Sequence, residues 1–298
     1  MNDEIDALFR QQLAAWPMLV RGVEGLARAK TRPVHIDWFD VFIRHIQHRV
    51  TSTTAAVDPA SIRMRPCFLC AGNLSPEEKG IPFGPDYVLY CNPFPIVEHH
   101  LTIVHRHHRL QRIAGEFGAL LDLAKALEGY FVIYNGPECG ASAPDHLHFQ
   151  AGSRGLFPIE ADTASVPGPA VPRYARNVLF FRSADRSHMI EKMNHAVELM
   201  SSVTGKTPEP LINIAVFHDA KTGWTAYIFP RGKHRPQVFH SGELTVSPAS
   251  IDLCGIFVVP LEKDFAKISA EDIAAIFREV TLPDNQFEEI VERWEITR

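Results

Sequence analysis

Residues 145–151 read Asp-His-Leu-His-Phe-Gln-Ala, a short run in which polar and apolar side chains alternate. Such alternation is typical of a β-strand with one face packed on a core, because successive side chains of a strand point to opposite faces. A strand here would place His146, His148 and Gln150 on one face. Three aligned polar groups are unusual in a purely structural strand, so we interpret this face as part of a reactive site.

The segments before this strand predict a mostly antiparallel sheet with a helix packed on one side. Their order is β-β-α-β-β, because Pro and Gly separate short β-rich runs and one proline-free stretch has helical periodicity. The expected strands span 87–91, 100–105, 130–134 and 145–151, and the expected helix spans 110–129.

The second half of the chain shows a similar order of elements. A stretch rich in Gly, Pro, Ala and Ser at 152–175 separates the halves like a linker. Beyond it we expect a helix at 185–203, strands at 211–218, 224–230 and near 251–259, and helices near 269–280 and 285–296. The sequence therefore predicts an α+β fold of two related halves, the second one degenerate.

The expected organisation has three parts. Residues 1–60 form an N-terminal extension; residues 1–50 read as helical, and a polar linker at 51–66 leads into the next part. Residues 61–155 form the reactive half and residues 175–298 the degenerate half.

Composition limits the class of protein. A chain of 298 residues with 46% hydrophobic and 22% charged residues is typical of a globular protein. Its formal net charge of -5 argues against a nucleic-acid partner, and it has no apolar run long enough to span a membrane. The N-terminus does not resemble a signal peptide. Five cysteines are too few for a disulfide framework, so we expect a cytoplasmic protein; a homodimer is left open.

The chemistry expected of the polar row is nucleophilic attack on phosphorus. A neutral imidazole has a free lone pair near pH 7, provided that a carbonyl oxygen holds the proton on its other nitrogen. Gln150 can donate a hydrogen bond to a phosphate oxygen but cannot act as a general acid. The leaving group should therefore already be stable as an anion, such as a sugar phosphate or a nucleotide.

A glycine-containing loop at 135–144 leads into the histidine strand. Gly140 permits close approach of backbone N–H groups to an anion, while Asn135 and Ser142 offer an amide and a hydroxyl. Loops of this composition are commonly simple turns, but the position directly before the strand favours a phosphate-binding role.

Cys67 and Cys70 form a CxxC motif, which is half of a zinc site or a redox pair. The chain has no second CxxC, so the remaining metal ligands would be histidines, with His108 and His146 as candidates. The alternative is a pair of reduced structural cysteines.

The turn at 229–236 gathers four potentially basic side chains within five residues, and these are Arg231, Lys233, His234 and Arg235. They could form a cationic clamp for a sugar phosphate or for an attacking phosphate. The alternative is a solvated basic turn.

Three motifs together resemble one protein family. PCFLCAGN at 66–73, YVLYCNPF at 87–94 and DHLHFQA resemble the galactose-1-phosphate uridylyltransferase branch of the histidine-triad superfamily, and DHLHFQA is nearly the segment typical of GDP-hexose phosphorylases. The pattern PxxxHHLTIVxRHH at 95–108 resembles the strand pair of the same superfamily. The resemblance covers residues 64–152, whereas the second half matches only in the order of its elements.

The resemblance implies a role for each matching residue. His148 would be the nucleophile and Gln150 a phosphate contact. Asn92 and Phe94 would line the nucleoside, and Asn135 and Ser142 would match phosphate-loop positions, although the spacing from Ser142 to His146 departs by one residue. The implied zinc or iron ligands are Cys67, Cys70, His108 and His146, and no organic cofactor is expected.

We therefore predict a nucleotidyltransferase that works through a covalent nucleotidyl-histidine. Phosphorolysis of a GDP-hexose is the first choice, because of the likeness of DHLHFQA. Uridylyl transfer to a hexose 1-phosphate and phosphorolysis of a dinucleoside polyphosphate are alternatives. A hydrolase is a further alternative, and Gln150 argues against it. A non-catalytic nucleotide-binding protein is another, and the intact histidine row argues against that.

Overall fold

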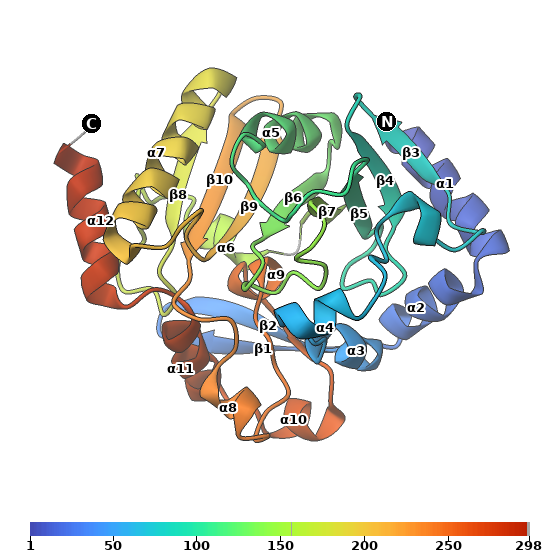
Figure 1. Ribbon diagram of the computed structural model, residues 1–298. Helices are drawn as coiled ribbons and strands as arrows, with labels where there is room; N and C mark the ends of the chain where they lie inside the picture. Colours follow the sequence, from blue (N-terminus) through green and yellow to red (C-terminus); the bar gives the residue numbers. More distant parts are fainter. Residues whose placement is uncertain (156, 297–298) are drawn as a thin grey trace.

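The computed structural model describes residues 1–155 and 157–296. Its centre is an antiparallel sheet of eight strands in the order β3-β4-β5-β7-β6-β9-β10-β8 (Figure 1). The strands are β3 (Gly80–Phe83), β4 (Tyr87–Cys91), β5 (Leu101–His105), β6 (Tyr130–Asn135), β7 (His148–Ser153), β8 (Leu179–Ser183), β9 (Ile212–Asp219) and β10 (Gly223–Pro230). The predicted α+β fold is confirmed.

The two halves of the chain share this one sheet. β6, the last strand of the first half in the sheet order, pairs with β9 of the second half, with Ile133 opposite Ala215 and Asn135 opposite Asn213. The strands that follow the predicted linker thus extend the same sheet. Among the described residues, backbone hydrogen bonds between β6 and β9 join the two halves. The boundaries proposed above between the parts remain a prediction.

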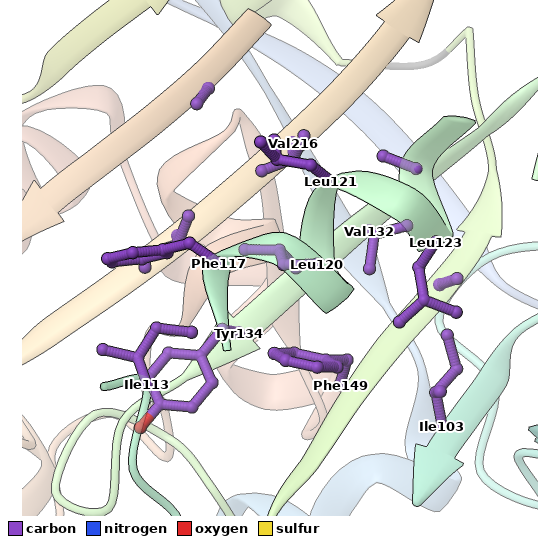
Figure 2. Close-up of a cluster of buried hydrophobic side chains, with 14 of the residues drawn as sticks. Ile103, Ile113, Phe117, Leu120, Leu121, Leu123, Val132, Tyr134, Phe149 and Val216 are labelled. Carbon is purple, nitrogen blue, oxygen red and sulfur yellow. The ribbon is translucent and has the colours of Figure 1, made fainter. Parts of the chain in front are cut away.

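Helices cover one face of the large sheet. They are α1 (Asn2–Ala15), α5 (Phe117–Ala126), α7 (Arg186–Thr204) and α12 (Asp284–Ile296). In α5 the apolar residues recur at helical spacing, and Leu120, Leu121 and Leu123 are fully buried over the sheet (Figure 2). They pack in one cluster with Val132 of β6 and Phe149 of β7.

A second, smaller sheet covers the opposite face. β1 (Lys30–Ile36) and β2 (Phe39–His45) form a hairpin, and β2 pairs in parallel with β11 (Ile256–Val259). Side chains of β2 alternate between buried and exposed. They share a second core with Phe131 and Ile133 of β6, whose residues therefore alternate between the two cores. This is why every residue of β6 is buried.

The expectation of helix throughout residues 1–50 is wrong for residues 28–46. The helices are α1 and α2 (Pro17–Ala27), and the chain then forms β1 and β2. The hairpin is specified by burial against β11 and the large sheet, and both partners are distant in sequence.

Other elements differ at their boundaries. The expected helix at 110–129 forms only as α5, and the expected strand at 251–259 divides into α9 (Ser250–Leu253) and β11. The supposed linker segments contain the short helices α3 (Val50–Thr53), α4 (Pro59–Arg63) and α6 (Pro158–Asp162). The remaining helices are η1 (Gln47–Arg49), η2 (Ala71–Asn73), α8 (Gln237–His240), α10 (Glu262–Lys267) and α11 (Ala270–Val280). Within the described ranges, no helix has the length and apolar character needed to cross a membrane.

Candidate active site

A cavity of about 840 Å³ opens on the face of the large sheet opposite α5. Its floor consists of side chains from β4, β5, β7 and β6, and its walls come from η1, α3 and α4 and from the segments around 234–235 and 247–252. The cavity therefore forms only where the N-terminal extension, the first half and the second half meet.

The strand register fixes the order of residues on the cavity floor. Gln150 of β7 lies opposite Thr102 of β5, and Thr102 lies opposite Tyr90 of β4. On the other side Gln150 lies opposite Ile133 of β6. All four line the cavity, so they form a row across four strands on one face.

His148 stands on the same face one pleat away from Gln150. Its Nδ1 lies 2.8 Å from the carbonyl oxygen of His146, an arrangement in which Nδ1–H donates and the lone pair belongs to Nε2. Nε2 has no hydrogen-bond partner in the part of the chain that the structure describes. Burial lowers the pKa of His148 to about 4, so the ring is neutral at pH 7. This is the protonation pattern that nucleophilic attack requires.

The Gln150 amide is oriented by His100, a residue that the sequence analysis did not single out. The Ile96 N–H donates to His100 Nδ1 at 3.1 Å, so His100 Nε2 carries the proton and donates to Gln150 Oε1 at 2.9 Å. His100 is fully buried, and burial lowers its pKa to about 3. The amide NH₂ of Gln150 is thereby left to face the cavity. The doubled histidine at 99–100 was the available signal.

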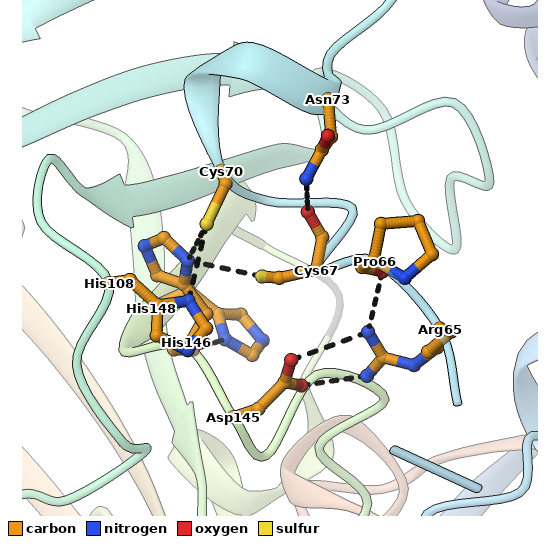
Figure 3. Close-up of polar contacts among 9 residues, drawn as sticks. All are labelled: Arg65, Pro66, Cys67, Cys70, Asn73, His108, Asp145, His146 and His148. Atoms are coloured by element: carbon orange, nitrogen blue, oxygen red, sulfur yellow. Dashed lines mark hydrogen bonds and ion pairs between the residues drawn. The ribbon is translucent and has the colours of Figure 1, made fainter. Parts of the chain in front are cut away.

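His146 does not continue the row as the alternation predicted. The strand begins at His148, and His146 lies in a bend before it. Its side chain is buried among Cys67, Cys70 and His108 instead of lining the cavity (Figure 3). Alternation therefore holds for His148 and Gln150 only.

The four predicted metal ligands come together. Their ligand atoms all lie within 4.8 Å of one another. Cys67 Sγ and Cys70 Sγ lie 3.3 and 3.6 Å from His146 Nδ1, and Cys70 Sγ lies 3.2 Å from His108 Nδ1. A tetrahedral zinc ion with bonds of about 2.3 Å to sulfur and about 2.0 Å to nitrogen requires separations close to these.

Hydrogen bonds around the cluster favour metal binding. His146 Nε2 lies 2.7 Å from the carbonyl oxygen of His105, so Nε2 carries the proton and Nδ1 is free to ligate. The Arg65–Asp145 ion pair, at 2.7 Å, joins the CxxC segment to the bend that holds His146. These residues fit a structural Cys₂His₂ metal site.

The loop before the histidine strand lies at the cavity wall. Gly140 and Ser142 line the cavity. Gly140 adopts φ +96°, and a Cβ there would lie 2.6 Å from the Cβ of Ala249, so glycine is required on two grounds. Asn135 Oδ1 accepts hydrogen bonds from Asn213 Nδ2 and from the N–H and hydroxyl of Ser250. Asn135 thus lines the cavity and also ties the two halves together.

The basic turn at 229–236 divides between two roles. His234 and Arg235 line the cavity, whereas Arg231 and Lys233 do not. Arg231 is 2% exposed, and its guanidinium donates to the carbonyls of Val280, Pro248, Lys233 and His234 and to Asn213 Oδ1. Lys233 pairs on the surface with Glu279 at 2.9 Å.

A further cation in the cavity comes from η1. Arg49 lines the cavity and donates through Nη1 to the carbonyl of Phe94 at 2.9 Å. Its Nε is buried without a hydrogen-bond partner. Burial lowers the pKa of Arg49 to about 10, which leaves it charged at neutral pH. Arg49 was not predicted from the sequence, because residues 1–50 carry no recognisable motif.

Comparison with known proteins is consistent with this architecture. Residues 8–153 match the model of a domain of unknown function, DUF4922, and residues 169–294 match the GDPGP1-like C-terminal domain. No curated protein matches the chain.

Solved structures show the same fold. The yeast Ap4A phosphorylase Apa2 superposes with a TM-score of 0.63 at 16% identity, over 90% of this chain and 98% of that one. Its complex with Ap4A gives a TM-score of 0.62 at 15% identity, over 93% and 97% of the two chains. The domain match, the shared fold and the geometry around His148 agree. Residues 169–294 therefore match a GDPGP1-like domain, the whole chain shares the fold of the yeast Ap4A phosphorylase, and both findings support the resemblance to the galactose-1-phosphate uridylyltransferase and GDP-hexose phosphorylase branch.

Proposed function

We propose that this protein is a nucleotidyl-transferring phosphorylase that cleaves a nucleoside diphosphate sugar, with a GDP-hexose as the preferred class. The observation that carries the proposal is the environment of His148: its Nδ1 proton is held by the His146 carbonyl, and Nε2 has no partner among the described residues of the cavity. The match of residues 169–294 to the GDPGP1-like domain supports the choice of a GDP-sugar.

The proposed first step is attack of His148 Nε2 on the α-phosphorus. The new N–P bond forms as the bond from the α-phosphorus to the bridging oxygen breaks, and the hexose 1-phosphate leaves as an anion with that oxygen and its electron pair. No proton has to be supplied to this leaving group, which agrees with the absence of an acid at position 150. The Gln150 NH₂, oriented by His100, would donate to a non-bridging oxygen of the transferred group.

In the proposed second step inorganic phosphate attacks the nucleotidyl-His148. Its oxygen forms the new P–O bond, the N–P bond breaks, and the nucleoside diphosphate departs while Nε2 regains its lone pair. Arg49, Arg235 and His234 line the cavity and are the groups suited to hold the attacking or departing phosphate. Asn92, Phe94, Asn135, Gly140 and Ser142 are proposed substrate contacts, since all line the same cavity.

A second candidate substrate is a dinucleoside polyphosphate. The likeness to yeast Ap4A phosphorylase over 90% of the chain favours it, and the same two steps apply with a nucleotide as the leaving group. Uridylyl transfer would follow the same two steps with a UDP-hexose as donor and a hexose 1-phosphate as acceptor.

We further propose that Cys67, Cys70, His108 and His146 bind zinc, or iron, as a structural ion beside the site. Bound there, the metal would fix the bend that leads into the histidine strand and would leave the chemistry to His148. We also propose a cytoplasmic location, because five cysteines are too few for a disulfide framework.

Trapping of the covalent intermediate tests the proposal. The protein is incubated with α-³²P-labelled GDP-, UDP- and ADP-hexoses, quenched in base and separated by electrophoresis. We expect label on the parent protein and on His188→Ala, whose histidine lies on the surface helix α7, but none on His148→Ala. Added phosphate should release the label as nucleoside diphosphate. Absence of label with every donor, or label that persists in His148→Ala, would refute the mechanism.

A further inference from the structure

We infer that Glu78 reads the base of the bound nucleotide and selects guanine. The inference rests on the proposed function in one respect, because it takes the transferred phosphate to lie at His148 and Gln150. From that point the cavity floor gives the direction in which the nucleoside extends.

The strand spacing of the cavity floor gives the distance from the phosphate position to the base position. Gln150, Thr102 and Tyr90 are consecutive members of one cross-strand row, and neighbouring strands are about 4.8 Å apart. Tyr90 therefore lies about 10 Å from Gln150 on the same face. A nucleoside monophosphate held by its phosphate at Gln150 and extended along this row would lay its sugar over Thr102 and its base near Tyr90.

The wall of the cavity near Tyr90 suits a planar base. Trp16 follows α1, which packs on β3 and β4, and Leu74 lies in the segment that leads into β3, so both apolar side chains line the cavity on the side of Tyr90. Arg235 and His234 follow β10, which lies beyond β6 in the sheet order, so these two basic side chains line the cavity on the opposite side. The apolar end is thus the one suited to a base and the cationic end the one suited to phosphate.

Most polar side chains at the apolar end are already engaged within the protein. Asn92 uses both ends of its amide, since Oδ1 accepts from the Phe94 N–H at 2.9 Å and Nδ2 donates to Thr102 Oγ1 at 3.1 Å. The Asn73 NH₂ donates to the carbonyl of Cys67 at 2.8 Å.

Glu78 differs from these residues. It lies in the turn that leads into β3, where its N–H donates to the carbonyl of Ser75 at 2.9 Å, and it lines the cavity. Within residues 1–155 and 157–296 its carboxylate has no hydrogen bond or ion pair. Burial raises the pKa of Glu78 to about 7, with Tyr90 and Cys91 as the titratable groups beside it. The carboxylate is an acceptor that lacks donors, which a ligand could supply.

Guanine offers the matching pattern. Its N1–H and N2–H₂ are adjacent donors on one edge and can pair with the two oxygens of a carboxylate, which only accepts. Adenine presents the acceptor N1 beside its N6–H₂ donor, and uracil presents a single donor between two acceptors, so each would set an acceptor against the carboxylate. A bidentate pair of this kind discriminates between bases by about ten- to hundredfold.

Nucleotide binding to the full-length protein tests this inference. GMP, IMP, AMP and UMP are titrated while the intrinsic tryptophan fluorescence, to which Trp16 in the cavity contributes, is followed, with calorimetry as a second measurement. We expect GMP to bind about ten- to hundredfold more tightly than AMP. IMP, which lacks the N2 amino group, should fall between them.

Three variants complete the test. Glu78→Gln can both donate and accept, so its preference should shift from GMP towards AMP, whereas Glu78→Ala should lose the preference without gaining affinity for AMP. Glu77→Gln, at the neighbouring exposed carboxylate, is the matched control and should behave like the parent. Thermal unfolding checks that each variant is folded. An unchanged GMP-to-AMP ratio in Glu78→Gln and Glu78→Ala, or a parent protein without preference for GMP, overturns the inference.

The outcome is independent of the covalent mechanism. A Glu78-dependent preference for GMP together with unlabelled His148 would refute the proposed function and retain the base-reading role. Labelled His148 with a base preference that Glu78 does not control would do the reverse.

Discussion

The orientation of one amide decides whether Gln150 presents a donor or an acceptor to the transferred phosphate. The Gln150 side chain could bond with either end, and a flipped amide would direct its carbonyl oxygen at an anion. The Ile96 N–H donates to His100 Nδ1, so His100 Nε2 carries the proton. A flipped Gln150 amide would set its NH₂ against this N–H, and two donors cannot pair, so the flip is unfavourable. His100 is therefore a positioning residue that acts through Gln150.

Replacement of His100 should impair turnover more than binding. We expect His100→Leu to lower kcat of phosphorolysis about tenfold to hundredfold, which corresponds to the loss of one oriented hydrogen bond in the transition state, and to change KM little. In a Gln150→Ala background the same substitution should have almost no further effect on kcat. Additive losses in the double variant would show that His100 acts by another route.

Arg231 and Lys233 stand in one basic turn, but they differ in burial and therefore in their expected contribution to stability. Arg231 and Lys233 belong to the same basic turn, yet Arg231 bonds to five acceptors in the interior and Lys233 makes one surface ion pair. We expect Arg231→Met to reduce the free energy of unfolding by about 3 kcal/mol or more, because it leaves buried carbonyls unsatisfied. Lys233→Met should change it by less than about 1 kcal/mol. Urea unfolding measures both, and equal losses would contradict this distinction.

At the scale of elements, the loop from β6 to β7 is held in one conformation by its packing. Gly140→Ala places a methyl group against Ala249 at a positive φ. We expect a loss of about 1–3 kcal/mol in the free energy of unfolding and slower labelling of His148. Gly72→Ala is the control, since a Cβ there meets nothing within 4 Å. Full stability of Gly140→Ala would mean that the loop can rearrange.

The elements that the sequence predicted are those with local signals. Turn residues and periodicity located β4, β5, β6, α7, β9, β10, α11 and α12 within a few residues. The hairpin β1–β2 was missed because its partners β11 and the far face of the large sheet are more than 80 residues away along the chain.

For the candidate site, too, the sequence predicted the residues that stand in recognisable motifs. His148, Gln150 and the Cys/His cluster stand in recognisable spacings, and the structure gathers them. Arg49 and Glu78 reach the site only through tertiary packing, so no spacing in the sequence marks them, whereas His100 stands in the doubled histidine of the 95–108 pattern.

At the scale of the whole molecule, the proposed metal site joins three segments that are far apart in sequence. Cys67 and Cys70 lie before the sheet, His108 follows β5 and His146 precedes β7. We expect native protein to contain about one equivalent of zinc or iron. Chelation should lower the melting temperature by several degrees, since a bound ion stabilises only the folded state. Cys67→Ser should lose the metal and show the same lower melting temperature, with no further decrease on chelation. Less than half an equivalent of metal in native protein would contradict the site.

The parallel pairing of β2 with β11 has a consequence for biosynthesis. The chain emerges from the ribosome N-terminus first. The β2 edge of the hairpin at residues 30–45 therefore stays unpaired until residues 256–259 have been synthesised. Arg49 and the short helices that wall the cavity follow this hairpin directly. Synthesis of the His148 strand is complete more than a hundred residues before that edge closes. The cavity around His148 is therefore complete only when the second half of the chain has been made, so on the proposed mechanism a nascent chain would not yet hold its substrate.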